Sequence, residues 1–100
     1  MIHVLAIITA KPGQRATVLE AFQANRPTVL AEAGCIEYGA ATDLETMGTA
    51  AYGPDAFVVI EKWESPDHLK AHAAAPHMAA YGAKTKELIA SRVIHVLTPA

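Results

Sequence analysis

Residues 57–72, FVVIEKWESPDHLKAH, decide the fold, because they predict a strand that runs straight into a helix. From Phe57 to Trp63, every second side chain projects from the same face of the strand. Ser65 is suited to cap the following helix, and Pro66 is suited to its first position. The stretch therefore predicts a strand–helix unit with a sharply defined junction.

Side chains from both parts of this unit are expected to meet. Leu69 and His72 share one face of the predicted helix. If that face packs on the strand face that carries Glu61 and Trp63, a carboxylate, an indole and an imidazole come together in a mostly apolar setting. This combination suits the binding and deprotonation of a small aromatic molecule.

Outward from this stretch, the hydrophobic pattern predicts four strands and two helical regions. The strands are expected at residues 2–10, 35–42, 56–64 and 93–98, and the helical regions at residues 14–33 and 66–90. Gly34 is expected to stop the first helix, and Pro76 to interrupt the second helical region. The β-α-β-β-α-β order is that of a single ferredoxin-like α+β domain spanning residues 1–100, with its helices on one face of the sheet.

The strand at residues 2–10 is apolar on both faces, which is typical of a strand that is covered on both sides. The two helices cover one face of the sheet, and a chain of 100 residues has nothing left to cover the other. We therefore expect a homodimer in which two sheets pack face to face. The long connection at residues 43–55 is expected to cover a pocket as a lid or to reach the partner subunit.

The composition excludes several classes of protein. The chain is 52% hydrophobic and 18% charged, so disorder is not expected. A net charge of -2 offers no basic surface for nucleic acid, and the apolar runs are too short to cross a bilayer. No secretion signal is recognisable and Cys35 has no disulfide partner, so the cytoplasm is the expected location.

The first helical region has an apolar stripe that also contains one polar residue. The stripe consists of Val18, Leu19, Phe22, Val29 and Leu30. Asn25 falls within it, so its amide needs a partner, and that partner is either a substrate oxygen or a backbone group freed by Pro27.

The motifs together resemble a known family. The run Phe57-x-x-x-Glu61-x-Trp63-x-Ser65-x-x-x-Leu69-x-x-His72, followed by Pro76-His77-Met78, resembles the antibiotic biosynthesis monooxygenase domain family. Residues 25–27 and 32–38 are similar to the first helix and second strand of that family. The resemblance spans nearly the whole chain. It implies a dimeric α+β barrel with a pocket in each subunit, between the helices and the sheet.

The resemblance leaves several activities open, because the family includes cofactor-independent oxygenases of quinols and phenols, haem-degrading enzymes and an isomerase of a phosphorylated signalling molecule. The haem-degrading members carry an Asn on the first strand and a Trp–His pair on the second helix. Here residues 2–10 contain no Asn, and His72 stands where that Trp is expected. The chain therefore looks more like the quinol oxygenase or signal-processing branch.

Within such a site, we expect His72, Glu61 and Asn25 to be catalytic. His72 is suited to act as a general base, since imidazole exchanges protons near neutral pH; the alternative is a core histidine bonded to a backbone carbonyl. Glu61 is expected to orient His72 or to bind a substrate hydroxyl. The alternative for Glu61 is an ion pair with Arg26, Lys84 or Arg92.

The remaining candidates would shape the pocket or bind an ion. Phe57, Trp63, Tyr81 and His77 are expected to contact the substrate, although core packing is the simpler role for Trp63. His68 and His72 have a chelating spacing, but no third ligand is evident, so no metal is expected. No glycine-rich phosphate loop or flavin fingerprint is present, so we expect no cofactor.

The sequence thus predicts a cofactor-independent monooxygenase that oxidises a small quinol or phenol with dioxygen. In this hypothesis His72 removes a phenolic proton while Glu61 or Asn25 fixes the geometry. The alternatives are an isomerase or processing enzyme for a small signalling ketone, and a non-catalytic ligand-binding domain on the same fold.

Overall fold

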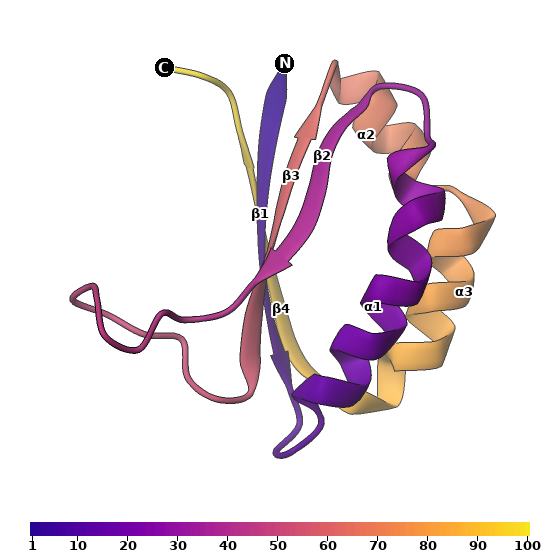
Figure 1. Ribbon diagram of the computed structural model, residues 1–100. Helices are drawn as coiled ribbons and strands as arrows, with labels where there is room; N and C mark the ends of the chain where they lie inside the picture. The colour runs from indigo at the N-terminus through magenta and orange to yellow at the C-terminus, as the bar shows by residue number, and fades with distance from the viewer.

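The computed structural model describes residues 1–100 and has the expected β-α-β-β-α-β order (Figure 1). Its elements are β1 (Ile2–Ala10), α1 (Arg15–Leu30), β2 (Cys35–Ala41), β3 (Ala56–Trp63), α2 (Pro66–Ala73), α3 (Pro76–Thr85) and β4 (Ile89–Leu97). A short 3-10 helix, η1 (Lys86–Leu88), joins α3 to β4. The predicted ferredoxin-like α+β fold is confirmed.

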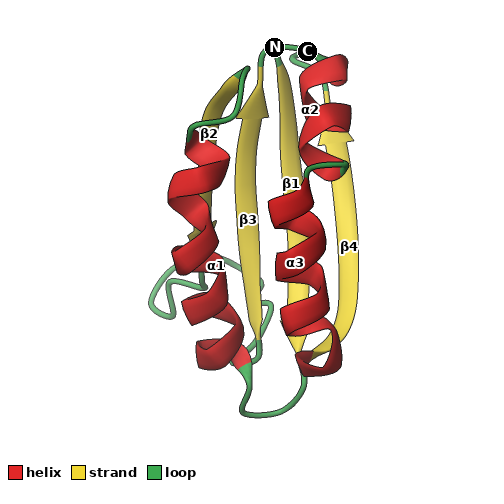
Figure 2. Cartoon of the chain, turned by 90° about the vertical axis from the view of Figure 1, so that its right-hand side faces the viewer, coloured by secondary structure: helices red, strands yellow, loops and turns green.

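The four strands form one antiparallel sheet in the order β2-β3-β1-β4. β1 lies in the centre, where Val4 pairs with Glu61 of β3 on one side and with Val96 of β4 on the other. All the helices lie on one face of this sheet (Figure 2). This register places Glu61 on the helix-facing surface beside Val4, toward the end of β3.

The core lies between the sheet and the helices. It contains alternate residues of β1 and β3, among them Val4, Ala6, Ile8, Phe57, Val59 and Trp63, all at most 6% exposed. Phe22 of α1 joins them, stacked on Tyr38 at a centroid distance of 5.0 Å and edge-on to Phe57 at 6.2 Å. The predicted alternation of the strand at residues 57–63 is therefore confirmed.

Several element boundaries differ from the predicted ones. β4 begins at Ile89 rather than residue 93, because Ile89 already pairs with Ala10 of β1. α1 ends at Leu30, which is 40% exposed and lies outside the apolar stripe, whereas Ala21 is buried in it. Pro27 lies inside α1 without ending it.

The predicted interruption of the second helical region is confirmed and has a structural consequence. Ser65 caps α2 by accepting a hydrogen bond from the His68 backbone N–H at 3.3 Å. α2 ends at Ala73, and Pro76 begins α3 as its first residue. After this short break, α3 continues beyond the end of α2, so the two helices follow one another end to end over the sheet (Figure 2).

The face of the sheet opposite the helices is largely apolar, although His3, Lys62 and His95 also lie on it, and no helix of this chain covers it. Its apolar side chains are Leu5, Ile7, Val58, Ile60, Val93 and Leu97. Three of them are exposed to solvent: Ile60 by 37%, Val93 by 50% and Leu97 by 44%. The connection between β2 and β3 projects on this open side (Figure 1). Its base is closed by Asp43, whose carboxylate accepts hydrogen bonds from the backbone N–H groups of Tyr52 and Gly53 at 3.0 and 2.9 Å.

None of the helices is long and apolar enough to cross a membrane.

Candidate active site

A cavity of about 770 Å³ lies between the sheet and the helices. Apolar side chains make up most of its wall, including Val4, Ala6, Ile8, Val59, Leu69 and Met78. The polar groups that line it include Tyr38, Glu61, His72, Tyr81, Lys86 and Arg92. A mostly apolar cavity with a few converging polar groups is typical of a small-molecule site.

His72 lies at the wall of this cavity and is only 5% exposed. It projects inward from α2, as the helical spacing from Leu69 predicted. Its ring lies beside the Trp63 indole at a centroid distance of 4.6 Å and edge-on to Tyr38 at 5.5 Å. These aromatic neighbours hold the imidazole in a defined orientation.

The two nitrogens of His72 have different carboxylate neighbours. Nδ1 lies 2.8 Å from Oε2 of Glu32, whereas Nε2 lies 3.9 Å from Oε1 of Glu61. Glu61 lines the cavity and Glu32 does not, so Nε2 is on the cavity side. Because an ionised carboxylate only accepts hydrogen bonds, Glu32 favours the neutral tautomer with its proton on Nδ1 and an Nε2 lone pair.

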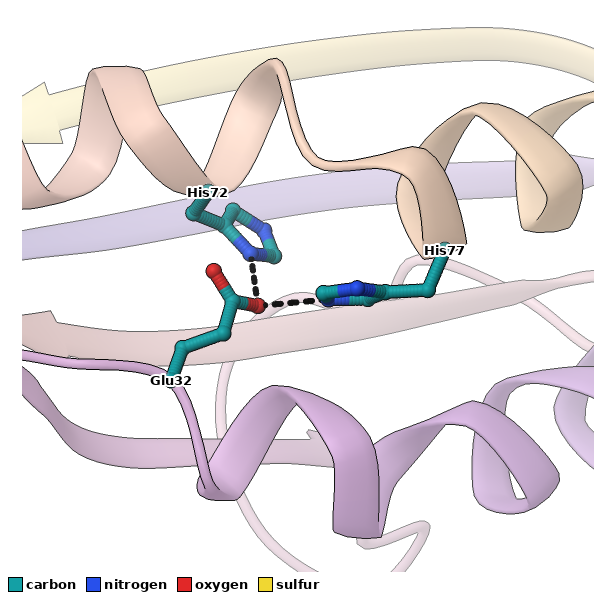
Figure 3. Close-up of side chains that lie close together, drawn as sticks. All are labelled: Glu32, His72 and His77. Atoms are coloured by element: carbon teal, nitrogen blue, oxygen red, sulfur yellow. Dashed lines mark hydrogen bonds and ion pairs between the residues drawn. The ribbon is translucent and has the colours of Figure 1, made fainter.

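Glu32 is the site residue that the sequence did not single out. It lies on the connection between α1 and β2, and its Oε2 is 2.8 Å from both His72 Nδ1 and His77 Nε2 (Figure 3). The contacts span 40 and 45 residues of sequence, so no local spacing could reveal them. Its place in the motif at residues 32–38 was the one available signal.

Glu61 is a buried carboxylate whose basic neighbour is His72, and no lysine or arginine pairs with it. The Trp63 indole N–H donates to Glu61 Oε1 at 2.9 Å. Burial raises the pKa of Glu61, although the Trp63 hydrogen bond and His72 oppose the shift. None of the ion pairs in the structure joins Glu61 to Arg26, Lys84 or Arg92, and Arg26 instead donates from Nε to the Tyr38 carbonyl at 2.6 Å. The ion-pair alternative for Glu61 is therefore wrong.

Two tyrosines add phenol groups to the cavity wall. Burial raises the pKa of Tyr38 far above its usual range, and burial also raises that of Tyr81, partly offset by the Arg92 charge. Both hydroxyls therefore stay protonated at neutral pH and can donate hydrogen bonds to a bound molecule. Tyr81 was among the predicted substrate contacts, whereas Tyr38 was not.

The structure separates the predicted site residues into two groups. His72, Glu61 and Tyr81 line the cavity together. The other four do not line it. Phe57 packs in the core against Phe22, and Trp63 is completely buried beside His72. His77 contacts Glu32, and the side chain of Asn25 on α1 contacts α3.

Asn25 has a partner other than the two expected for it. Its Nδ2 lies 3.4 Å from the Met78 sulfur on α3, so the amide faces a neighbouring helix rather than the sheet. Met78 in turn lines the cavity. Asn25 therefore supports the cavity wall from behind.

The cluster that could hold a metal also differs from the pair considered in the sequence. His68 bonds to Ser65 Oγ through Nδ1 at 2.7 Å, and its Nε2 lies 3.9 Å from Glu64. The three residues with converging ligand atoms are instead Glu32, His72 and His77.

Fold and site together define the class of protein: an α+β domain with a largely apolar cavity and, at its wall, an imidazole that contacts a carboxylate. Residues 1–84 match the antibiotic biosynthesis monooxygenase family, and the chain belongs to that family. It is 40% identical over 99% of its length to "Probable quinol monooxygenase YgiN" of Escherichia coli K12, 98% of which is covered.

Two solved structures of low sequence identity share the fold. PA3566 from Pseudomonas aeruginosa superposes with a TM-score of 0.84 at 24% identity, covering 99% of this chain and 93% of that one. Rv0793 from Mycobacterium tuberculosis superposes with a TM-score of 0.83 at 24% identity, covering 99% and 94%.

Proposed function

We propose that the protein is a cofactor-independent monooxygenase that oxidises a small quinol or phenol with dioxygen. One observation carries the proposal: Glu32 holds Nδ1 of His72 at 2.8 Å, which leaves the Nε2 lone pair on the side of a mostly apolar cavity. The name of the relative YgiN, a probable quinol monooxygenase, supports the same substrate class.

In this proposal His72 starts the reaction as a general base. A substrate hydroxyl gives its proton to Nε2, and the resulting imidazolium is stabilised by Glu32 at Nδ1. Glu61, 3.9 Å from Nε2, is a second proton acceptor, since burial raises its pKa above the ordinary value of a carboxyl group. The Tyr38 and Tyr81 hydroxyls are placed to donate hydrogen bonds to the substrate oxygens.

The phenolate then reduces dioxygen without a protein-bound redox group. It transfers one electron to dioxygen, and the two radicals combine to form a carbon–oxygen bond. The peroxide anion that results takes back the proton from His72 and becomes a hydroperoxide, which then loses water. One quinol and one dioxygen thus give one hydroxyquinone and one water. The apolar wall suits this step, because it keeps water away from the radical pair.

A homodimer is part of the proposal. The open face of the sheet exposes Ile60, Val93 and Leu97, and the connection at residues 43–55 projects on the same side (Figure 1). A second copy that packs on this face would cover the exposed side chains, and the connection would reach the partner rather than close over its own cavity. The cytoplasm remains the proposed location.

The test is oxygen consumption by the purified protein with several reduced quinols and phenols, each measured against its rate of autoxidation. Reaction under ¹⁸O₂ should place one heavy oxygen atom in the hydroxyquinone and the other in water. Proton exchange into a ketone substrate without oxygen uptake would instead support the isomerase alternative. Saturable binding without either reaction would support a ligand-binding domain.

A further inference from the structure

We propose that Glu32, His72 and His77 form a binding site for a divalent transition metal such as Zn²⁺, and that the bound ion switches off His72 as a base. The site lies on the side of His72 that faces away from the cavity. Metal binding itself is independent of the proposed oxygenase function, whereas the inhibitory effect rests on it.

The three side chains converge from separate parts of the chain (Figure 3). Glu32 follows α1, His72 lies in α2, and His77 lies in the first turn of α3. Oε2 of Glu32 lies 2.8 Å from both Nδ1 of His72 and Nε2 of His77, and all three ligand atoms fall within 4.8 Å of one another. The bend at Pro76 makes this convergence possible, because a continuous helix would carry His77 away from His72.

The donor set suits a borderline-soft divalent ion. Two imidazole nitrogens and one carboxylate oxygen, with a fourth position for water, are common ligands of Zn²⁺. Bonds of about 2.0–2.2 Å would place neighbouring ligand atoms roughly 3.3 Å apart. The two contacts of 2.8 Å therefore need to lengthen by about half an ångström.

The burial of the three residues is consistent with such a site. The His72 side chain is 7% exposed and held by aromatic neighbours, so it supplies a fixed ligand. Glu32 and His77 are 14% and 25% exposed, which leaves an entry path for the ion and room for both side chains to adjust.

Glu61 supplies an outer partner for the metal ligand. A histidine that binds a metal through one nitrogen usually donates the N–H of its other nitrogen to a carboxylate. Glu61 Oε1 lies 3.9 Å from Nε2 of His72, and the Trp63 indole N–H holds that oxygen in place at 2.9 Å. Glu32 and Glu61 thus lie on opposite sides of His72, and Glu61 has to approach from 3.9 Å to accept the Nε2 N–H once a metal occupies Nδ1.

The chemical consequence follows from the tautomer of His72. Without metal, Glu32 favours the proton on Nδ1, and Nε2 carries the lone pair that faces the cavity. A metal on Nδ1 requires the ring proton to be on Nε2. The neutral ring gains and loses no proton overall, but Nε2 becomes a donor toward Glu61 and can no longer accept a proton from a substrate.

Metal binding is tested directly on the full chain. Co²⁺ and Zn²⁺ are titrated into metal-free protein and followed by the visible Co²⁺ spectrum, by calorimetry and by elemental analysis after dialysis. We expect one ion per chain. Glu32→Gln and His77→Gln should each weaken binding by more than about 100-fold, since a lost ligand costs more than a lost outer partner. His68→Gln, a nearby histidine outside the cluster, should bind as the parent does.

Three results would overturn the site: no stoichiometric binding, binding that survives both ligand substitutions, or binding that His68→Gln abolishes. If Glu32→Gln fails to fold, the more exposed His77→Gln still decides the question. The switch is read by ¹⁵N NMR of the histidine rings, where Zn²⁺ should move the His72 proton from Nδ1 to Nε2. An unchanged His72 tautomer in the zinc-bound protein would overturn the switch, whether or not any quinol is oxidised.

Discussion

The two faces of the sheet carry different kinds of side chains, because successive residues of each strand point to opposite faces. On the helix-facing side, polar side chains lie within an otherwise apolar core: His72 lies beside Glu61 and contacts Glu32. The opposite side has exposed apolar residues such as Ile60 and Val93. Buried polar groups need specific partners, whereas an exposed apolar surface needs only to be covered. In the proposed function, the helix-facing side serves chemistry and the opposite side serves association with a second copy of the chain.

The largest effect is expected on the helix-facing side, at His72. His72→Gln should lower turnover by roughly 10²–10⁴-fold, because glutamine keeps some hydrogen bonding but cannot accept a proton. The melting temperature and circular dichroism spectrum should stay close to those of the parent, and His68→Gln serves as the matched control. A His72→Gln protein that keeps full turnover but melts much earlier would make His72 a structural residue.

The open face is tested by placing a charge on it. Ile60→Asp should convert a dimer into a monomer at micromolar concentration, since a carboxylate in a face-to-face interface would be buried without a partner. Light scattering measures the change. Ala83→Asp adds the same charge to an exposed position of α3 and should leave the dimer intact. A parent protein that is itself a monomer at this concentration would refute the assigned role of this face.

A smaller effect on stability is expected at Gly34, in the connection between α1 and β2. Gly34 has φ +79°, and a Cβ there would lie 2.3 Å from the His68 ring, whereas Gly13 has φ +78° and open space around it. Alanine should cost roughly 1–2 kcal/mol at either position because of the left-handed backbone. Denaturant unfolding should show a larger loss for Gly34→Ala. Equal losses would mean that His68 moves aside without cost.

The smallest effect concerns the buried carboxylate of Glu61. Folding raises its pKa above the ordinary value of 4.5, so folding favours the protonated form. The stability from this group is complete below pH 4.5 and is lost as the pH rises through the folded-state pKa. Glu61→Gln can still accept the Trp63 hydrogen bond but cannot ionise.

Melting temperatures of Glu61→Gln and the parent should therefore converge in acid, and the variant should become the more stable protein toward neutral pH. Asp67→Asn, an exposed carboxylate in the first turn of α2, is the control and should show no such gain. If Glu61→Gln is instead less stable at neutral pH, the ionised carboxylate and His72 attract each other more strongly than burial penalises the charge.

The sequence alone determined the order of the elements, the helical face of Leu69 and His72 and the strand face of Glu61, because these follow from local periodicities. Strand alternation repeats every two residues and helix faces every three to four, so both can be read within one element. The capping by Ser65 and the break at Pro76 are equally local. The double-sided apolar pattern of β1 likewise indicated the open face.

Tertiary structure alone decided which side chains complete the cavity and which merely support it. Glu32 reaches His72 across 40 residues, and Tyr38 joins the cavity wall from β2. Asn25 faces Met78 because α3 lies beside α1, and no spacing within α1 reveals which element is its neighbour. Local pattern places a side chain on a face, and only the packing of whole elements places it beside a partner.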